Sequence, residues 1–125
     1  MAKSKAVKKE ETSEVSNREE RPWGWFETVH EGENFKVKKL FIKKGQRISL
    51  QSHDQRDEHW VVISGFGTVE LDEMERHIGT GGHIFIPKKH KHRISAAKDL
   101  VLIEVQMGIC EEKDIRRYQD DYGRV

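Results

Sequence analysis

Residues 45–65 read GQRISLQSHDQRDEHWVVISG, a run in which side chains that commonly bind metals interrupt two β-prone segments. Gln51 and His53 are two residues apart, so on a strand both side chains point to the same face. Glu58 follows a charged loop at residues 54–57 and opens a second strand, whose residues 60–63 are aromatic or β-branched. A hairpin of this kind brings Gln51, His53 and Glu58 together, which predicts a site between its strands.

The rest of the chain continues the pattern of short strands. Turn signals at residues 31–34 and 72–75 separate alternating segments, and the segment at 83–86 ends at Pro87. Only residues 111–122, EEKDIRRYQDDY, have a helical pattern, with Ile115 and Tyr118 as a small docking face and Gly123 as the stop. About nine short strands and a short C-terminal helix predict an all-β barrel or sandwich.

The length of 125 residues allows one hydrophobic core. Charged residues make up 36% of the chain, but they are unevenly spread, and residues 1–20 offer too few apolar side chains to pack. We expect residues 1–20 to form a disordered tail and residues 21–125 to form the folded domain. A basic amphipathic helix over residues 2–9 is the alternative for part of the tail.

The overall charge and the single cysteine exclude several classes of protein. A net charge of +1 gives no reason to expect a nucleic acid or an anionic membrane as partner. Cys110 is alone, so no intrachain disulfide can form, and the sequence shows neither a secretory signal nor an apolar run that could span a bilayer. We therefore expect a cytoplasmic protein.

The most apolar run, LVLIEVQ at residues 100–106, predicts a central strand with a polar end. Leu102, Glu104 and Gln106 share one face of it, and a buried carboxylate needs a partner, which indicates a polar cavity. Lys36 and Lys38 interrupt another strand. Either they protect an exposed edge or one of them reaches into the cavity to meet an anion.

Two motifs with fixed spacing surround these residues. The first, G-x5-H-x-H-x(3,4)-E-x6-G, is matched in spacing by Gly45, Gln51, His53, Glu58 and Gly65. The second, G-x5-P-x-G-x2-H-x3-N, is matched by Gly81, Pro87 and His92. Gln51 stands for a histidine, Lys89 for a glycine and Ala96 for an asparagine. The pair of motifs resembles the cupin superfamily, which implies a jelly-roll-like, double-stranded β-helix barrel with a metal inside.

The cupin resemblance implies four metal ligands: Gln51, His53, Glu58 and His92. Two imidazoles, a carboxylate and an amide oxygen form a borderline to hard set of donors. Such a set suits one divalent ion of zinc, manganese, iron, nickel or cobalt.

A narrower resemblance covers nearly all of residues 21–124. It rests on RPWG at 21–24, FKVK at 35–38, SLQSH at 49–53, RDEHWVVISG at 56–65, EVQMG at 104–108 and DIRRYQDDYGR at 114–124. In these segments the chain resembles the type II mannose-6-phosphate isomerase domain. That domain commonly forms the C-terminal part of bifunctional mannose-1-phosphate guanylyltransferases, whose glycine-rich phosphate loop this sequence does not contain.

The resemblance implies reversible isomerisation of mannose 6-phosphate and fructose 6-phosphate. The reaction removes a carbon-bound proton and needs a group that stabilises the resulting negative charge on oxygen. The candidates for the base are Glu104, His90 and Lys38. The candidates for holding the phosphate, beside Lys38, are Arg21, Arg56 and Arg93, because a guanidinium pairs with phosphate in a bidentate manner.

Other functions remain open on the same residues. One is a non-catalytic module that binds a sugar phosphate or sugar nucleotide and partners a separate nucleotidylyltransferase. Another is a different metal cupin activity, such as an oxygenase or an epimerase, although Gln51 argues against the histidine-rich iron site of an oxygenase. A homodimer is also expected, because the outward positions of two strands are apolar: Val61, Ile63, Val101, Ile103 and Val105.

Overall fold

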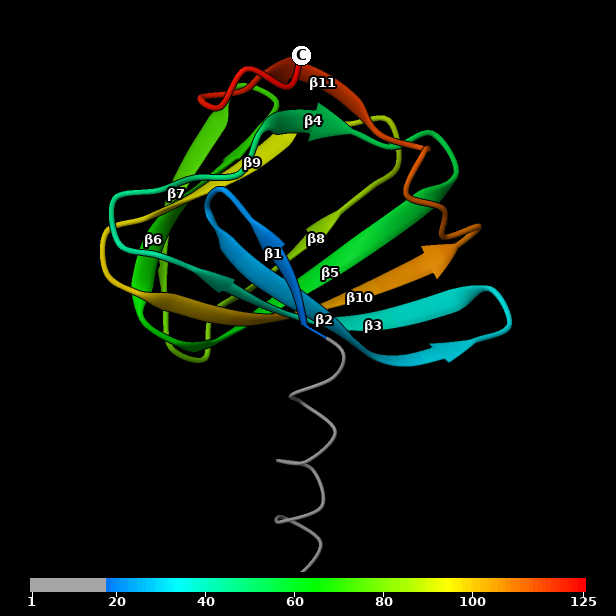
Figure 1. Cartoon of the computed structure of the whole chain (residues 1–125), viewed down its shortest axis with the longest axis horizontal. Helices are drawn as coiled ribbons and strands as arrows, with labels where there is room; N and C mark the ends of the chain where they lie inside the picture. The colour runs from blue at the N-terminus through cyan, green and yellow to red at the C-terminus, as the bar shows by residue number, and fades with distance from the viewer. Residues whose placement is uncertain (1–17) are drawn as a thin grey trace, which may run out of the picture.

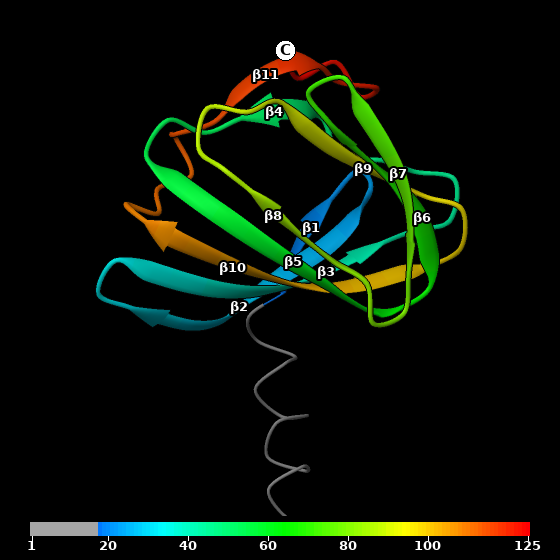
Figure 2. The ribbon, with the colours of Figure 1, turned by 180° about the vertical axis from the view of Figure 1, so that it is seen from behind.

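The computed structural model describes residues 18–125, which form eleven β-strands in two antiparallel sheets. The strands are β1 (Arg18–Arg21), β2 (Gly24–Gly32), β3 (Phe35–Ile42), β4 (Leu50–Ser52), β5 (Arg56–Ser64), β6 (Phe66–Leu71), β7 (Met74–Gly79), β8 (His83–Ile86), β9 (His92–Ala96), β10 (Leu100–Gly108) and β11 (Arg116–Gln119). One sheet has the order β1-β2-β3-β10-β5-β8 and the other β11-β4-β9-β6-β7. The sheets face each other around a common interior (Figures 1 and 2).

The inward faces of the central strands are apolar at one end and polar at the other. On β10, Leu102 is buried and is followed on the same face by buried Glu104 and Gln106. The antiparallel register sets Gln106 opposite Glu58 of β5 and Glu104 opposite Lys38 of β3. The polar ends of three adjacent strands therefore meet at one end of the barrel, as the alternation in residues 100–106 predicts.

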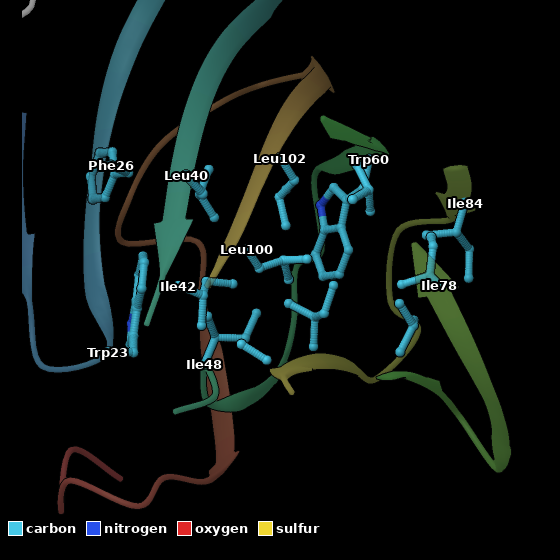
Figure 3. Packing of buried hydrophobic residues seen from close by; sticks show 14 of the residues in the cluster. Trp23, Phe26, Leu40, Ile42, Ile48, Trp60, Ile78, Ile84, Leu100 and Leu102 are labelled. Carbon is cyan, nitrogen blue, oxygen red and sulfur yellow. The ribbon is translucent and has the colours of Figure 1, made fainter. Parts of the chain in front are cut away.

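The apolar end of the barrel holds the hydrophobic core. Side chains of both sheets interlock there, as Figure 3 shows, around Leu100 and Leu102 of β10. The buried cluster includes Trp23, Phe26, Leu40, Ile42, Ile48, Trp60, Val62, Val69, Ile78, Ile84, Ile86 and Ile94. Burying this much apolar surface on one side of both sheets is what stabilises the closed barrel.

The predicted helix over residues 111–122 is wrong, and residues 18–125 contain no helix at all. In its place, a turn precedes β11, which pairs with β4 so that Arg117 lies opposite Gln51. A short helix with two apolar side chains is marginal by itself. The free edge of β4 offers backbone hydrogen bonds and a barrel end to cover, and this tertiary context decides the conformation.

Three residues of the expected tail, residues 18–20, are among the described residues. Residues 18–20 belong to β1, which pairs with β2, and the guanidinium of Arg18 lies 3.7 Å from the centre of the Trp25 ring. The remainder of the predicted tail, residues 1–17, lies outside the described residues. Among residues 18–125, no helix is long and apolar enough to cross a membrane.

Candidate functional site

Three buried side chains converge at the polar end of the barrel and could hold a metal ion. Their possible ligand atoms, one each from His53, Glu58 and His92, all lie within 4.8 Å of one another. His53 Nε2 is 3.3 Å from Glu58 Oε2, and His92 Nε2 is 3.8 Å from Glu58 Oε1. His53 directly follows β4, Glu58 lies in β5 and His92 begins β9, so the cluster forms only when the two sheets close.

Backbone carbonyls orient both imidazoles. His53 Nδ1 lies 2.8 Å from the Asp114 carbonyl oxygen, and His92 Nδ1 lies 2.9 Å from that of His90. A carbonyl only accepts hydrogen bonds, so each Nδ1 carries the proton and each Nε2 directs its lone pair toward Glu58. Burial lowers the pKa of His53 and that of His92, the latter to about 4, which keeps both rings in the neutral form that binds metals.

His92 Nε2 provides a direct test of whether a metal fits here. It is buried, and no residue of 18–125 forms a hydrogen bond with it, which is unusual for a buried polar atom unless a ligand completes it. Gln51 is paired with His92 across β4 and β9, so the two side chains share a face. The Gln51 amide nitrogen donates to Ser49 Oγ at 2.9 Å, which leaves the amide oxygen as the possible ligand. The four expected residues therefore fit one divalent ion.

The Arg56 guanidinium contacts this cluster directly. Its Nε donates to Glu58 Oε2 at 2.9 Å, and its Nη2 lies 3.4 Å from His53 Nε2. Its Nη1 donates to the Glu111 carbonyl oxygen at 3.1 Å. In this structure the guanidinium neutralises Glu58, a role different from the phosphate contact expected of Arg56 from the sequence.

A pocket opens beside the cluster, and its wall is rich in charge. Glu58 belongs to both the cluster and the wall, whereas His53 and His92 are not part of the wall. The other charged side chains of the wall are Arg21, Lys38, Arg56, Glu104, Glu112, Arg117 and Arg124. The structure thus brings Arg21, Lys38, Arg56 and Glu104, all expected site residues, to the same pocket as Gln51 and Glu58.

Glu104 is the wall residue best placed to exchange a proton. It is buried, accepts a hydrogen bond from Gln106 Nε2 at 2.8 Å and lies opposite Lys38 in the sheet. Burial, assisted by the negative charge of Glu58, raises the pKa of its carboxyl group to about 7, while the charge of Lys38 opposes the shift. A carboxyl group with a pKa in this range is suited to general acid and base chemistry near neutral pH.

Arg117 and Arg124 are pocket residues that the sequence pattern did not indicate. Arg117 Nε is buried without a hydrogen-bond partner among residues 18–125, whereas Arg124 is held by both carboxylate oxygens of Asp120. The predicted helix gave no reason to place these residues in the pocket wall, because a helix would have directed Arg117 away from the barrel. The alternation of Ile115 and Arg117, both of which line the pocket, is the signal that indicates a strand.

Two expected residues lie away from the pocket. The His90 side chain is exposed and its Nδ1 is 2.5 Å from Asp72 Oδ2, so only its backbone carbonyl touches the cluster, through His92. Arg93 is buried, but it donates to the Ile48 carbonyl oxygen and to Gln119, and it does not line the pocket. Arg93 thus ties β9 to the C-terminal segment and not to a ligand.

The sequence as a whole can be assigned to a family. Residues 8–120 match the model of the family described as Mannose-6-phosphate isomerase C-terminal. The chain belongs to this family. Its relatives include mannose-1-phosphate guanylyltransferase ManC of Salmonella typhimurium, which is 38% identical over 108 residues. They also include the alginate biosynthesis protein AlgA of Pseudomonas aeruginosa, which is 40% identical over 108 residues.

The family match concerns one part of longer proteins. Each of these two alignments covers 84% of this chain and 22% of the relative, so the chain spans less than a quarter of the length of the curated relatives it matches. ManC and AlgA therefore contain long regions that have no counterpart in these 125 residues.

Solved structures show the same fold. KdgF from Halomonas sp. superposes with a TM-score of 0.74 at 17% identity, covering 80% of this chain and 93% of that one. An RmlC-like cupin from Shewanella frigidimarina gives a TM-score of 0.73 at 18% identity, covering 80% and 90%. Oxalate decarboxylase of B. subtilis gives 0.75 at 18% identity, covering 83% and 31%. The predicted cupin barrel is confirmed.

Proposed function

We propose that this chain is a sugar-phosphate-binding cupin module that works beside a mannose-1-phosphate guanylyltransferase. The relatives support this role, because ManC is named as that enzyme and the matched region is one part of it. The family description supports a ligand related to mannose 6-phosphate. An isomerase acting in the same pocket would bind the same class of ligand.

The observation that carries the proposal is that two buried side-chain atoms lack a hydrogen-bond partner, on residues that flank Gln51 in the sheet. Among residues 18–125, His92 Nε2 and Arg117 Nε are the two buried side-chain polar atoms without a hydrogen-bond partner. His92 Nε2 offers a lone pair that can bind a metal, and Arg117 Nε offers an N–H group that can donate to an anionic oxygen. Arg117 also has no acidic partner in this part of the chain, so its charge is available to a phosphate.

A second candidate is isomerisation of mannose 6-phosphate and fructose 6-phosphate in the same pocket. The observation that favours it is the buried carboxyl group of Glu104, which lies opposite Lys38 and whose pKa near 7 allows it to exchange a proton at neutral pH. In this reaction Glu104 takes the proton from C2 of the sugar and returns it to C1, while the hydroxyl proton passes from O2 to O1, so that the carbonyl moves from C1 to C2. A divalent metal held by Gln51, His53, Glu58 and His92 would supply Lewis-acid stabilisation of negative charge on the sugar oxygens.

One set of measurements separates the two candidates. Calorimetry follows the binding of mannose 6-phosphate, and a coupled assay follows fructose 6-phosphate, each with added manganese, iron, cobalt, nickel or zinc. Binding without turnover for every metal supports the module. Turnover that Glu104→Gln abolishes supports the isomerase, and absence of binding with every metal contradicts both.

Matched variants sharpen this test. Glu27→Gln also removes a buried carboxylate, but Glu27 does not line the pocket, so we expect it to leave binding and turnover unchanged. Arg117→Met should weaken binding of mannose 6-phosphate by about tenfold, because a charge-assisted hydrogen bond to phosphate is lost. Equal binding by Arg117→Met and the unmodified chain would remove the main support for the phosphate site.

The module role has its own experiment. The chain is added to a ManC enzyme from which the region that matches this chain has been deleted. A change in the guanylyltransferase rate, or a stable complex between the two proteins, is expected if the module works beside that activity. Absence of both effects, together with mannose 6-phosphate turnover by the chain alone, would favour the isomerase.

A further inference from the structure

The mouth of the pocket contains an ion pair whose two partners differ strongly in exposure. Lys38 Nζ lies 2.6 Å from Glu112 Oε2, and the Lys38 side chain is 7% exposed while that of Glu112 is 61% exposed. Lys38 comes from β3, and its ammonium group also lies 4.2 Å from the centre of the Phe26 ring. Glu112 lies on residues 109–115, the strap that joins β10 to β11 and climbs from one sheet to the other (Figure 1).

Because of this asymmetry, separating the pair costs more free energy at Lys38 than at Glu112. A buried ammonium group needs a nearby anion, because it cannot regain its hydration without leaving the barrel. The Glu112 side chain is largely exposed, so its carboxylate can turn outward into water at a small desolvation cost. Glu104 lies opposite Lys38 in the sheet, but the ion pair that Lys38 forms within residues 18–125 is with Glu112.

The backbone of the strap is fixed independently of this pair. The Asp114 carboxylate accepts hydrogen bonds from the backbone N–H groups of Asp54 and Gln55, at 3.1 and 2.9 Å. The Glu111 carbonyl oxygen accepts a hydrogen bond from Arg56. Release of Lys38 therefore requires rotation of one side chain, while the strap stays in place.

We propose that the Glu112 carboxylate competes with the anionic group of the ligand for Lys38. Binding of the ligand displaces this carboxylate from the Lys38 ammonium group. This inference rests on the proposed binding of a sugar phosphate in the pocket. A phosphate replaces the lost ion pair and brings more charge than the carboxylate, whereas a neutral sugar offers Lys38 nothing in exchange. Glu112 is thus a specificity-determining residue that limits the preference of the pocket for phosphorylated sugars over free ones.

The test compares two variants that each remove one negative charge from the strap. Glu112→Gln removes the competitor. Glu111→Gln is the matched control, because the Glu111 side chain is exposed, forms no ion pair within residues 18–125 and does not line the pocket. Calorimetry measures the binding of inorganic phosphate, mannose 6-phosphate and mannose to each protein, after far-UV circular dichroism has shown that it is folded.

We expect Glu112→Gln to bind inorganic phosphate and mannose 6-phosphate about fivefold more tightly than the unmodified chain, since a partly exposed ion pair no longer competes. Its discrimination against mannose should rise by the same factor, and Glu111→Gln should match the unmodified chain. Once Lys38→Met has removed the shared partner, adding Glu112→Gln to that variant should bring no further gain in affinity.

The outcomes that overturn the inference are distinct from those that overturn the proposed function. If the unmodified chain binds mannose 6-phosphate and Glu112→Gln binds it equally or more weakly, Glu112 supports the site and does not compete with the ligand. If Lys38→Met leaves the gain in place, the gain is a general charge effect. If neither the unmodified chain nor Glu112→Gln binds any phosphate, the proposed function and the inference both fall.

Discussion

Glu58 occupies the centre of the cluster because four groups, two donors and two imidazoles, face its two oxygens. Oε1 accepts a hydrogen bond from Trp60 Nε1 at 3.1 Å, and Oε2 accepts one from Arg56 Nε at 2.9 Å. The two imidazoles face the same carboxylate with unprotonated Nε2 atoms, which do not neutralise it. Arg56 and a bound metal are therefore alternative sources of positive charge for the same buried group.

This competition gives a prediction for Arg56→Met. In the presence of a chelator, the free energy of unfolding should fall by about 3 kcal/mol, because a buried carboxylate loses its guanidinium partner. Added zinc or manganese should then raise the melting temperature more in this variant than in the unmodified chain, since the metal now supplies the missing charge. Thermal unfolding with and without metal measures both effects.

Arg93→Met is the control for that experiment. Arg93 is equally buried, but its hydrogen bonds go to the neutral groups of Ile48 and Gln119. We expect it to lose stability without gaining a larger response to metal. A metal response of the same size in Arg56→Met and the unmodified chain would show that Arg56 does not compete for the site.

The backbone conformation of Lys89 leads to a second prediction about a single residue. It stands where the motif has glycine, and its φ of 73° is in the left-handed region that glycine adopts without strain. Its N–H donates to the His53 carbonyl oxygen at 2.6 Å, so the turn is fixed beside the cluster. Lys89→Gly should raise the free energy of unfolding by about 0.5 kcal/mol, the relief of strain exceeding the added entropy of the unfolded chain.

Denaturant unfolding checks this value, with Lys88→Gly as the control. Lys88 is not among the positive-φ residues of 18–125, so glycine there should only cost stability. A loss of stability in both variants would contradict the strain argument.

The sequence predicted the cluster better than the pocket wall. Gln51, His53 and Glu58 lie close together in the chain, and the motif spacing marks them as one site. The expected hairpin is wrong, however, because β4 and β5 belong to different sheets and the three residues meet only when the sheets close. Arg117 could not be identified in the same way, because its place in the wall depends on the pairing of β11 with β4, more than 60 residues away in sequence. An extended segment would set His90 on the face of His92, but the segment is not extended and only the His90 carbonyl is turned inward.

At the scale of elements, the prediction from sequence differs most from the structure in the C-terminal segment. The same segment adds residues to the pocket wall that the sequence did not indicate. Its sequence suits a helix locally, yet several of its side chains form hydrogen bonds with distant residues in the structure. Asp114 holds the loop before β5, Tyr118 Oη lies 2.9 Å from Ser52 Oγ, and Tyr122 Oη donates to Gln46 at 2.7 Å. Long-range pairs of this kind override local helix propensity, and no pattern within residues 111–122 encodes them.

Asp120 allows the stability of this segment to be tested by pH. Arg124 donates to both of its carboxylate oxygens, and this lowers the pKa of Asp120 to about 2. Because the pKa is lower in the folded than in the unfolded chain, the stabilisation is complete above about pH 4 and is lost as the pH falls toward 2. Asp120→Asn should therefore reduce the free energy of unfolding by about 1 kcal/mol at pH 6 and have almost no effect near pH 2.

Denaturant midpoints measured from neutral to acidic pH check this dependence. Asp121→Asn is the control, since Asp121 pairs with Arg47 at the exposed surface and should change stability little at any pH. An effect of Asp120→Asn that stays constant down to pH 2 would show that the ion pair is not its cause.

At the scale of the whole molecule, the barrel has one apolar and one polar end, and the sequence of residues 100–106 already contains this division. The outer surface is also divided. The outward positions of β10 are occupied by Val101, Ile103, Val105 and Met107, and the neighbouring strand β5 adds exposed Val61 and Ile63. The next strand, β8, adds Phe85, which is 48% exposed.

We propose that a second copy of the chain covers this outer face, because the face is largely apolar and can complement itself about a two-fold axis. Light scattering should give twice the mass of the chain at micromolar concentration. Ile63→Lys should give the single-chain mass, since an ammonium group buried in the contact between two copies opposes association. Met74→Lys, at an exposed apolar residue of β7 in the other sheet, should remain a dimer. A single-chain mass for the unmodified protein, or dissociation caused by Met74→Lys alone, would contradict the assignment of this face.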